Sequence, residues 1–252
     1  MSNNNVPALK VEGLHKSFGG LTVLNGIDFE VHPGGRLGII GPNGSGKTTM
    51  MEIISGFLAP NSGTVRVAGK DISRSSASQR AQQGISRTFQ VAAVVQEWTV
   101  FDNLALAAST QKHLGVRRLQ PVRRNHEITA AVEQAAEDWG VSTMLNTPVA
   151  QLSYGFVRRT ELAVASLSQP RVFLLDEPAA GLSNEEGAEV VQRVSNLFPT
   201  AAIILVEHDM DIMFEFSDEI LVLGSGEVLA HGSPEEVRNH ERVREAYLGS
   251  EL

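Results

Sequence analysis

Apolar and polar residues alternate in some segments of this chain and run together in others, and the two patterns predict different strands. Residues 36–40, 172–175 and 202–206 are mostly continuous apolar runs. Such runs are typical of parallel strands, because helices cover both faces of a parallel sheet. Residues 9–12 alternate, and residues 63–69 form a short β-branched run between two glycines. The chain is therefore predicted to be an α/β protein with a parallel-sheet core and an antiparallel β flank.

The middle of the chain has a helical pattern. Ala, Leu, Glu and Gln are abundant from 103 to 145, with Pro121 as an interruption, and this composition favours helices. We expect a helical subdomain over about 91–165, inserted into a core and flank formed by 8–90 and 166–252.

The carboxyl-terminal part contains two local signals. Residues 219–223 and 227–230 flank a Gly-Ser-Gly segment and are predicted to form a β-hairpin. Ser233, followed by proline and then by Glu236, has the capping pattern with which a last helix is expected to begin. The sequence contains no internal repeat, so we expect a single domain over 1–252.

Composition and charge narrow the class of protein. The 252 residues are 42% hydrophobic and 20% charged, as in an ordinary globular protein. The net charge of −8 argues against a nucleic-acid partner, because clustered Lys and Arg are needed to bind phosphate backbones. The arginine pairs at 117–118 and 123–124 belong either to a solvated loop or to a contact with anionic lipid or a partner.

Cysteines and targeting signals are missing from the sequence. Residues 1–7 lack a basic stretch followed by an apolar one, and no apolar run reaches membrane-spanning length. The absence of cysteine excludes disulfides, thiolate metal sites and cysteine nucleophiles. The cytoplasm is therefore the expected compartment.

A glycine-rich segment after the first apolar run carries the clearest chemistry. It fits the pattern G-x-x-x-x-G-K-[S/T], and the predicted strand before it and helix over 47–54 after it are the context that this motif requires. The lysine of such a loop binds the β- and γ-phosphates of a nucleotide, its hydroxyl reaches Mg²⁺, and its amides line the anion site. The predicted nucleotide-binding residues are Gly41, Pro42, Asn43, Gly44, Ser45, Gly46, Lys47, Thr48 and Thr49, of which Lys47 is also predicted to be catalytic and Thr48 to ligate Mg²⁺.

Polar residues also follow the other two apolar runs. Asp176 and Glu177 are adjacent at a strand end, where one carboxylate can face Mg²⁺ and the next can face a water that attacks the γ-phosphate. His208 follows the run 202–206, and the carboxyl ends of parallel strands meet at one edge of a sheet. We therefore expect Asp176 to be a metal ligand, and Glu177 and His208 to be catalytic.

Three further segments carry weaker signals. Gln90 precedes the helical insert, and its amide can contact Mg²⁺ or water. Phe18 can stack on an adenine or can belong to the core. The segment 152–155, Leu-Ser-Tyr-Gly, is either an ordinary helix cap or an anion-binding helix start built from its amides and the Ser153 hydroxyl. Because this segment is distant in sequence from the phosphate loop, it can serve the ATP of a second subunit.

Together these segments resemble the motif set of an ABC ATPase, and the resemblance covers nearly the whole chain. The family implies a P-loop NTPase fold with a RecA-like core, ATP and Mg²⁺ as cofactors, and two ATPase domains that close head to tail on two ATP molecules. Ser153 and Gly155 would then contact the nucleotide of the other domain. The positions that carry the resemblance are Phe18, 41–49, Gln90, 152–155, 172–177 and His208.

Within that family, the chain is similar to the ATPases of branched-chain amino acid importers through segments 17–21, 84–90, 175–182 and 206–210 and the tail 232–249. The resemblance implies a subunit that hydrolyses ATP at the cytoplasmic face of the inner membrane. Its partners would be a second ATPase subunit, identical or different, two transmembrane permeases and, indirectly, a periplasmic solute-binding protein. Related ATPases power urea uptake or lipopolysaccharide export, and a soluble ABC ATPase or a P-loop kinase is a more distant alternative.

Three positions depart from the family pattern. Phe156 replaces the usual Gln or Glu after the signature glycine, Val164 stands where Arg is common, and Ser183 stands where Asp or Asn usually follows. Each change removes a polar contact expected at the dimer interface, so we expect asymmetric turnover in a heterodimer.

Apolar residues after Gln90 are candidates for contact with a permease helix. These residues can instead pack in the core of the helical subdomain. They are Val91, Val94, Val95 and Trp98.

Overall fold

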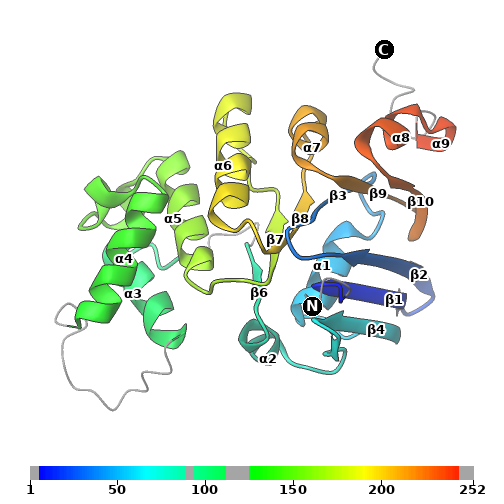
Figure 1. Cartoon of the computed structure of the whole chain (residues 1–252), viewed down its shortest axis with the longest axis horizontal. Coiled ribbons are helices and arrows are strands. Elements are labelled where there is room, and N and C mark those ends of the chain that lie inside the picture. The colour runs from blue at the N-terminus through cyan, green and yellow to red at the C-terminus, as the bar shows by residue number, and fades with distance from the viewer. Residues whose placement is uncertain (1–5, 89–93, 112–124, 244–252) are drawn as a thin grey trace, which may run out of the picture.

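The computed structural model describes residues 6–88, 94–111 and 125–243. It contains two β-sheets, and a group of helices lies at the end of the molecule opposite the smaller sheet (Figure 1).

The larger sheet has six strands in the order β10-β9-β3-β8-β7-β6. All neighbours in it pair in parallel except β9 and β10. Every residue of β7 and β8 is buried, which explains their unbroken apolar sequence. The predicted parallel core and carboxyl-terminal hairpin are therefore confirmed. The strands are β3 (Arg36–Ile40), β6 (Ile85–Arg87), β7 (Val172–Asp176), β8 (Ala202–Val206), β9 (Glu219–Gly224) and β10 (Glu227–Gly232).

The smaller sheet is antiparallel and has the strand order β2-β1-β4-β5. Its inward residues and the apolar side of α1 (Lys47–Ser55) form one core cluster with the larger sheet. Helix α1 therefore lies between the two sheets, and the predicted antiparallel flank is confirmed. The strands are β1 (Leu9–Phe18), β2 (Leu21–Val31), β4 (Ser62–Val67) and β5 (Lys70–Asp71).

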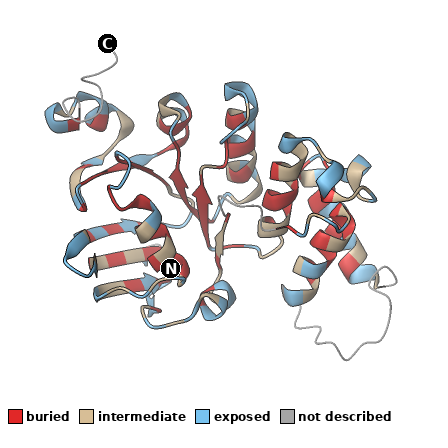
Figure 2. Ribbon diagram, turned by 180° about the vertical axis from the view of Figure 1, so that it is seen from behind, coloured by how far each residue is buried: buried red, intermediate tan, exposed pale blue. Residues whose placement is uncertain are grey.

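The other helices cover the opposite face of the larger sheet or extend from it. Helices α3, α4 and α5 pack on one another and share a second core cluster with α6 and α7. Figure 2 marks the buried residues of these helices in red. None of the helices in the described residues is long and apolar enough to cross a membrane. The helices are α2 (Ala77–Gln82), α3 (Val100–Gln111), α4 (His126–Asp138), α5 (Tyr154–Ser166), α6 (Asn184–Leu197) and α7 (Met210–Phe216), with 3-10 turns at Ser142–Met144 and Val149–Gln151.

The described part of the chain ends in two short helices, α8 (Pro234–Asn239) and α9 (Glu241–Val243). Ser233 is the N-cap of α8, and a reciprocal capping box with Glu236 is present as predicted. The expectation that α8 is the last helix was wrong. His240 adopts an extended conformation that ends α8, and one further helical turn follows it.

Candidate active site

The glycine-rich segment forms the turn between β3 and α1, and close packing explains two of its glycines. A Cβ at Gly41 would lie 2.5 Å from the carbonyl oxygen of Leu223, and one at Gly46 would lie 2.8 Å from that of Val23. Gly46 is also the N-cap of α1 and has a φ of 105°. A larger residue at either position would displace the neighbouring backbone.

Lys47 is buried at the start of α1 and is held by its own loop. Its Nζ donates to the carbonyl oxygens of Gly41, at 2.5 Å, and Pro42, at 3.1 Å. Burial lowers the pKa of the Lys47 ammonium, and the carboxylates of Glu177 and Asp176 partly oppose this effect. The ammonium of the loop and the two carboxylates therefore share one electrostatic environment.

Two hydroxyl groups of the loop differ in their surroundings. Ser45 Oγ is buried and has no hydrogen-bond partner within the described residues. Thr48 is exposed in the first turn of α1, which contains no acidic residue. A buried unpaired hydroxyl next to the positive end of a helix dipole fits an anionic ligand.

Asp176, the last residue of β7, is paired with an arginine that the sequence analysis did not select. Arg87 Nη2 lies 2.9 Å from Asp176 Oδ2, and the two side chains are 7% and 2% exposed. Arg87 also donates to Ser55 Oγ at the end of α1 over 3.1 Å. The carboxylate is therefore held in one position at the end of its strand.

Glu177 and His208 come together although they follow different strands. Glu177 Oε1 lies 3.0 Å from His208 Nε2. The main chain supports this contact, because the Glu177 N–H donates to the carbonyl oxygen of Val206 over 2.8 Å. Glu177 has a φ of 49°, a left-handed conformation that is uncommon for a residue other than glycine.

Glu207 connects the loop after Glu177 with the loop at His208. Its buried carboxylate accepts the N–H of Ala179 at 2.6 Å and the N–H of His208 at 3.1 Å. Burial raises the pKa of the Glu207 carboxyl, and the two N–H donors partly oppose this effect. Both the segment after Glu177 and the backbone of His208 are thus fixed by one side chain.

Ser153 is the N-cap of α5, but its hydroxyl makes no capping hydrogen bond. The serines that begin α2, α6 and α8 behave differently, because each accepts the amide of the third helical residue. Ser153 and Tyr154 are exposed. Ser153 therefore occupies the cap position of α5 without a side-chain capping bond, and the start of the helix is accessible.

The other two nucleotide-contact candidates have different outcomes. Phe18 is 49% exposed, so its alternative assignment to the core is wrong, and Lys16 Nζ lies 5.0 Å from the centre of its ring. Gln90 lies outside the described residues, as do the arginine pairs 117–118 and 123–124.

Three buried charged residues beside this site were missed in the sequence analysis. Arg87 and Glu207 contact the candidate residues as described above, and Arg158 in α5 donates to main-chain carbonyls from Asp176 to Pro178. Arg87 and Glu207 have one common signal, a charge at the end of a strand or directly after it and next to a motif. Such a charge has to be paired, because an unpaired buried charge is strongly unfavourable.

Comparison with known proteins places these residues in a family. A model of the ABC transporter family matches residues 24–180, more than half of the chain, and a model for the branched-chain amino acid ATP-binding cassette transporter matches residues 227–252. The chain is 36% identical to the high-affinity branched-chain amino acid transport ATP-binding proteins LivG of Escherichia coli (strain K12) and BraF of Pseudomonas aeruginosa. Each alignment covers 96% of this chain and 98% of the relative. The lipopolysaccharide export system ATP-binding protein LptB of Haemophilus influenzae is 29% identical, with 97% and 98% covered.

Solved structures agree with this assignment. The ADP conformation of an ATP-binding cassette of an ABC transporter is similar with a TM-score of 0.86 and 28% identity, covering 98% of this chain and 100% of that one. CbiO1 from Clostridium perfringens, part of an ABC transporter complex, has a TM-score of 0.79 and 26% identity, with 98% and 96% covered. The fold is thus the P-loop ABC ATPase fold, and the chain belongs to the ATP-binding, ATP-hydrolysing cassettes of the ABC transporter family.

Proposed function

We propose that this chain is the ATP-hydrolysing subunit of an ABC importer for branched-chain or related amino acids. One observation carries the hydrolytic part, the 3.0 Å contact between Glu177 Oε1 and His208 Nε2 at the sheet edge where β3 enters the phosphate loop. The transport part rests on the relatives LivG and BraF, which are named for high-affinity branched-chain amino acid transport.

The loop from Gly41 to Thr49 would hold the phosphates of ATP. Lys47, which donates to two carbonyls of its own loop, would exchange them for β- and γ-phosphate oxygens. The unpaired Ser45 hydroxyl and the first amides of α1 add donors to the same place. The exposed ring of Phe18 would stack on the adenine.

The oxygen donors beside the loop fit Mg²⁺, which takes few protein ligands and keeps its other positions for phosphate and water. Thr48 and Asp176 would hold it, with Gln90 as a further ligand. Within the described residues no group of three or more His, Cys, Asp or Glu side chains could form a metal site, which suits an ion held partly by ATP. When bound, Mg²⁺ neutralises the charge that develops on the phosphates. Arg87 keeps Asp176 at the strand end that this role requires.

Glu177 would act as the general base that accepts a proton from the attacking water. His208 contacts its carboxylate and would orient both that group and the γ-phosphate. Lys47 would stabilise negative charge on the phosphates at the same edge. The Glu207 hydrogen bonds keep the backbone on both sides of this pair in place.

A second ATPase subunit would complete each site. Ser153 and Gly155 begin α5, far in sequence from the phosphate loop, and the uncapped hydroxyl of Ser153 supports a contact with the nucleotide of a partner. In this arrangement residues 1–252 form one nucleotide-binding domain, with the core and flank at 8–90 and 166–252 and the helical subdomain at about 91–165.

The three departures from the family pattern support unequal sites in a heterodimer. Ser183 caps α6 of its own chain, and Phe156 and Val164 pack partly buried against the core. None of the three supplies the charged or amide group expected at the partner's nucleotide. Equal loss of ATP turnover on changing the catalytic glutamate of either subunit would contradict this asymmetry.

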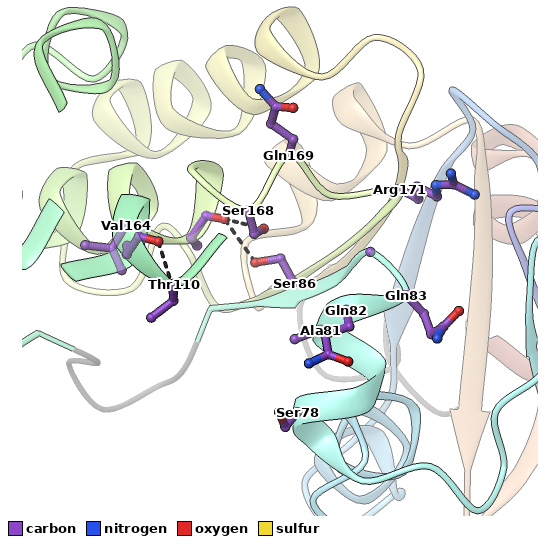
Figure 3. Close-up of a pocket in the computed structure, with 13 residues that line it drawn as sticks. Ser78, Ala81, Gln82, Gln83, Ser86, Thr110, Val164, Ser168, Gln169 and Arg171 are labelled. Carbon is purple, nitrogen blue, oxygen red and sulfur yellow. Dashed lines mark hydrogen bonds between the residues drawn. The ribbon is translucent and has the colours of Figure 1, made fainter. Parts of the chain in front are cut away.

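Two transmembrane permeases would dock on the groove between the sheet core and the helical subdomain. A cavity of about 690 Å³ lies where α2, β6 and the ends of α3 and α5 meet. Figure 3 shows Gln82, Gln83, Ser86 and Arg171 on its core side and Val164 and Thr110 on its helical side. Ser86 Oγ donates to the carbonyl oxygen of Ala165 over 3.1 Å and so joins the two sides.

The apolar residues after Gln90, also candidates for contact with a permease, differ in exposure. Val94 packs in the core, which contradicts a direct permease contact by this residue. Val95 and Trp98 are 37% and 43% exposed and remain candidates, whereas Val91 lies outside the described residues. Through the permeases, the cassette would be bound peripherally at the cytoplasmic face of the inner membrane.

ATP hydrolysis in reconstituted liposomes tests the proposal. The chain, its permeases and a second ATPase would be assembled, and phosphate release would be measured with binding proteins loaded with leucine or urea. Stimulation by leucine supports the proposed solute. Stimulation by urea, or turnover that responds to lipopolysaccharide and to no binding protein, would assign a different transported substrate. The proposal that the chain hydrolyses ATP would still stand. Undiminished turnover in the Glu177→Gln variant would refute the hydrolytic site.

A further inference from the structure

Arg158 connects the helix that begins at Ser153 with the loop that carries Glu177. It lies in the second turn of α5, is 5% exposed, and its guanidinium has two kinds of partner. Nε donates to the carbonyl oxygen of Pro178 at 3.0 Å, and Nη2 donates to those of Asp176 at 3.2 Å and Glu177 at 2.9 Å. One side chain thus holds three consecutive carbonyls at the end of β7.

Glu161 orients this guanidinium. Its Oε2 accepts from Arg158 Nη1 at 2.8 Å, and the two side chains are 8% and 6% exposed. Burial raises the pKa of the Glu161 carboxyl, and Arg158 partly opposes this effect. A buried ion pair is weak evidence for stabilisation, because apolar residues can often replace it without loss. Its fixed donors are better explained by the backbone that they hold.

That backbone contains the left-handed residue of the site. Glu177 has a φ of 49°, and such a conformation persists only where neighbouring groups impose it. The Val206 carbonyl accepts the Glu177 N–H from the side of β8, and Arg158 holds the carbonyls from the side of α5. The direction of the Glu177 carboxylate therefore depends on where α5 lies.

The first turn of α5 touches the same loop at a second place. A Cβ at Gly181 would lie 2.8 Å from the ring of Tyr154, and one at Gly155 would lie 3.7 Å from Leu182 Cδ2. The first turn of α5 and the loop after Glu177 therefore approach each other closely at two places. A shift of α5 cannot leave that loop unchanged, because packed elements transmit strain.

We propose that Arg158 is a positioning residue that couples the two nucleotide sites: it links the start of α5, which binds the partner's nucleotide, to the chain's own catalytic carboxylate. The inference rests on the proposed function. Binding of the partner's nucleotide at Ser153 would fix the position of α5. Because Arg158 holds the Glu177 backbone, it would then fix the position of Glu177 as well. Occupancy of one site would thereby set the hydrolytic competence of the other.

Arg158→Lys in the full chain tests this coupling. Lysine keeps the charge but cannot provide the fork that reaches three carbonyls and Glu161 together. We expect kcat for ATP hydrolysis to fall by at least about tenfold, while KM and the equilibrium binding of ATP stay within about twofold of wild type. The dependence of rate on ATP concentration should also lose any cooperativity that the wild type has. Glu161→Gln should give a smaller loss of kcat, because the guanidinium keeps its carbonyl contacts.

Arg80→Lys is the matched control. Arg80 is also buried and also donates to main-chain carbonyls, but those belong to the end of α1 and the segment before α2. The melting temperature of Arg80→Lys should fall by about as much as that of Arg158→Lys, while its kcat should stay at the wild-type value. A wild-type kcat in folded Arg158→Lys, or equal kcat losses in Arg158→Lys and Arg80→Lys, would overturn the inference. If wild type lacks ATPase activity, or if Glu177→Gln retains it, the proposed function itself fails.

Discussion

Replacing Glu207 with glutamine should lower the rate of ATP turnover but increase the stability of this protein relative to wild type as the pH rises. The two carboxylate oxygens of Glu207 accept the N–H groups of Ala179 at 2.6 Å and His208 at 3.1 Å. Glutamine keeps one acceptor oxygen and places an NH₂ donor at the position of the other. One of the two backbone N–H groups therefore loses its acceptor.

The effect on turnover follows from the position of those N–H groups. Ala179 lies two residues after Glu177, and His208 contacts Glu177 directly. A hydrogen bond to a charged acceptor contributes about 1.5–3 kcal/mol. If this loss is expressed fully in the transition state, kcat falls by roughly 10- to 160-fold. The affinity for ATP should be unchanged, because the phosphate loop makes no hydrogen bond to Glu207 among those described.

Although Glu207→Gln should lower turnover, its free energy of unfolding should increase relative to wild type as the pH rises. Burial raises the pKa of Glu207 above the ordinary value of 4.5 that it has in the unfolded chain. Between these two pKa values the folded protein binds more protons than the unfolded one, so wild-type stability decreases as the pH rises through this window. Glutamine cannot ionise. The stability of Glu207→Gln relative to wild type should therefore increase from about pH 4.5 upward.

Urea unfolding at about pH 5 and about pH 8, together with phosphate release, measures both effects. Glu185→Gln on the exposed start of α6 is the control and should change neither. Wild-type turnover in Glu207→Gln, or a stability difference that does not change with pH, would refute the reasoning.

Substitutions at three other residues have defined outcomes. Glu177→Gln should reduce ATP turnover by at least about 100-fold with ATP binding retained, measured by phosphate release and equilibrium binding; normal turnover would exclude Glu177 as the base. Arg80→Met should lower the free energy of unfolding in urea by about 3–5 kcal/mol, since Arg80 is 1% exposed and caps four main-chain carbonyls; a loss below about 1 kcal/mol would contradict this role. Ser183→Ala should lower the free energy of unfolding by about 1 kcal/mol in the same assay, and Ser183→Asp should leave it unchanged, because aspartate also caps α6; an unchanged stability in Ser183→Ala would show that the cap is unimportant.

The local elements and the phosphate loop could be read from the sequence by itself. Unbroken apolar runs identified β7 and β8 because both faces of these strands are covered. The glycine loop was recognisable because only glycine fits where neighbouring carbonyls approach, as at Gly46. The capping box at Ser233 was also predictable, since all its groups lie within four residues. In each case the determining interactions lie between near neighbours or depend on burial alone.

The tertiary structure decided which distant groups meet. Strand β8 lies between β3 and β7, and this order brings His208 to Glu177 from a loop 31 residues away. The buried partners Arg87 of Asp176 and Arg158 of the next carbonyls had no periodic signal. Local preferences specify helices and strands, whereas strand order and long-range contacts are selected by packing of the whole core. Which charged residues hold the Glu177 carboxylate and its backbone is therefore decided only in the folded chain.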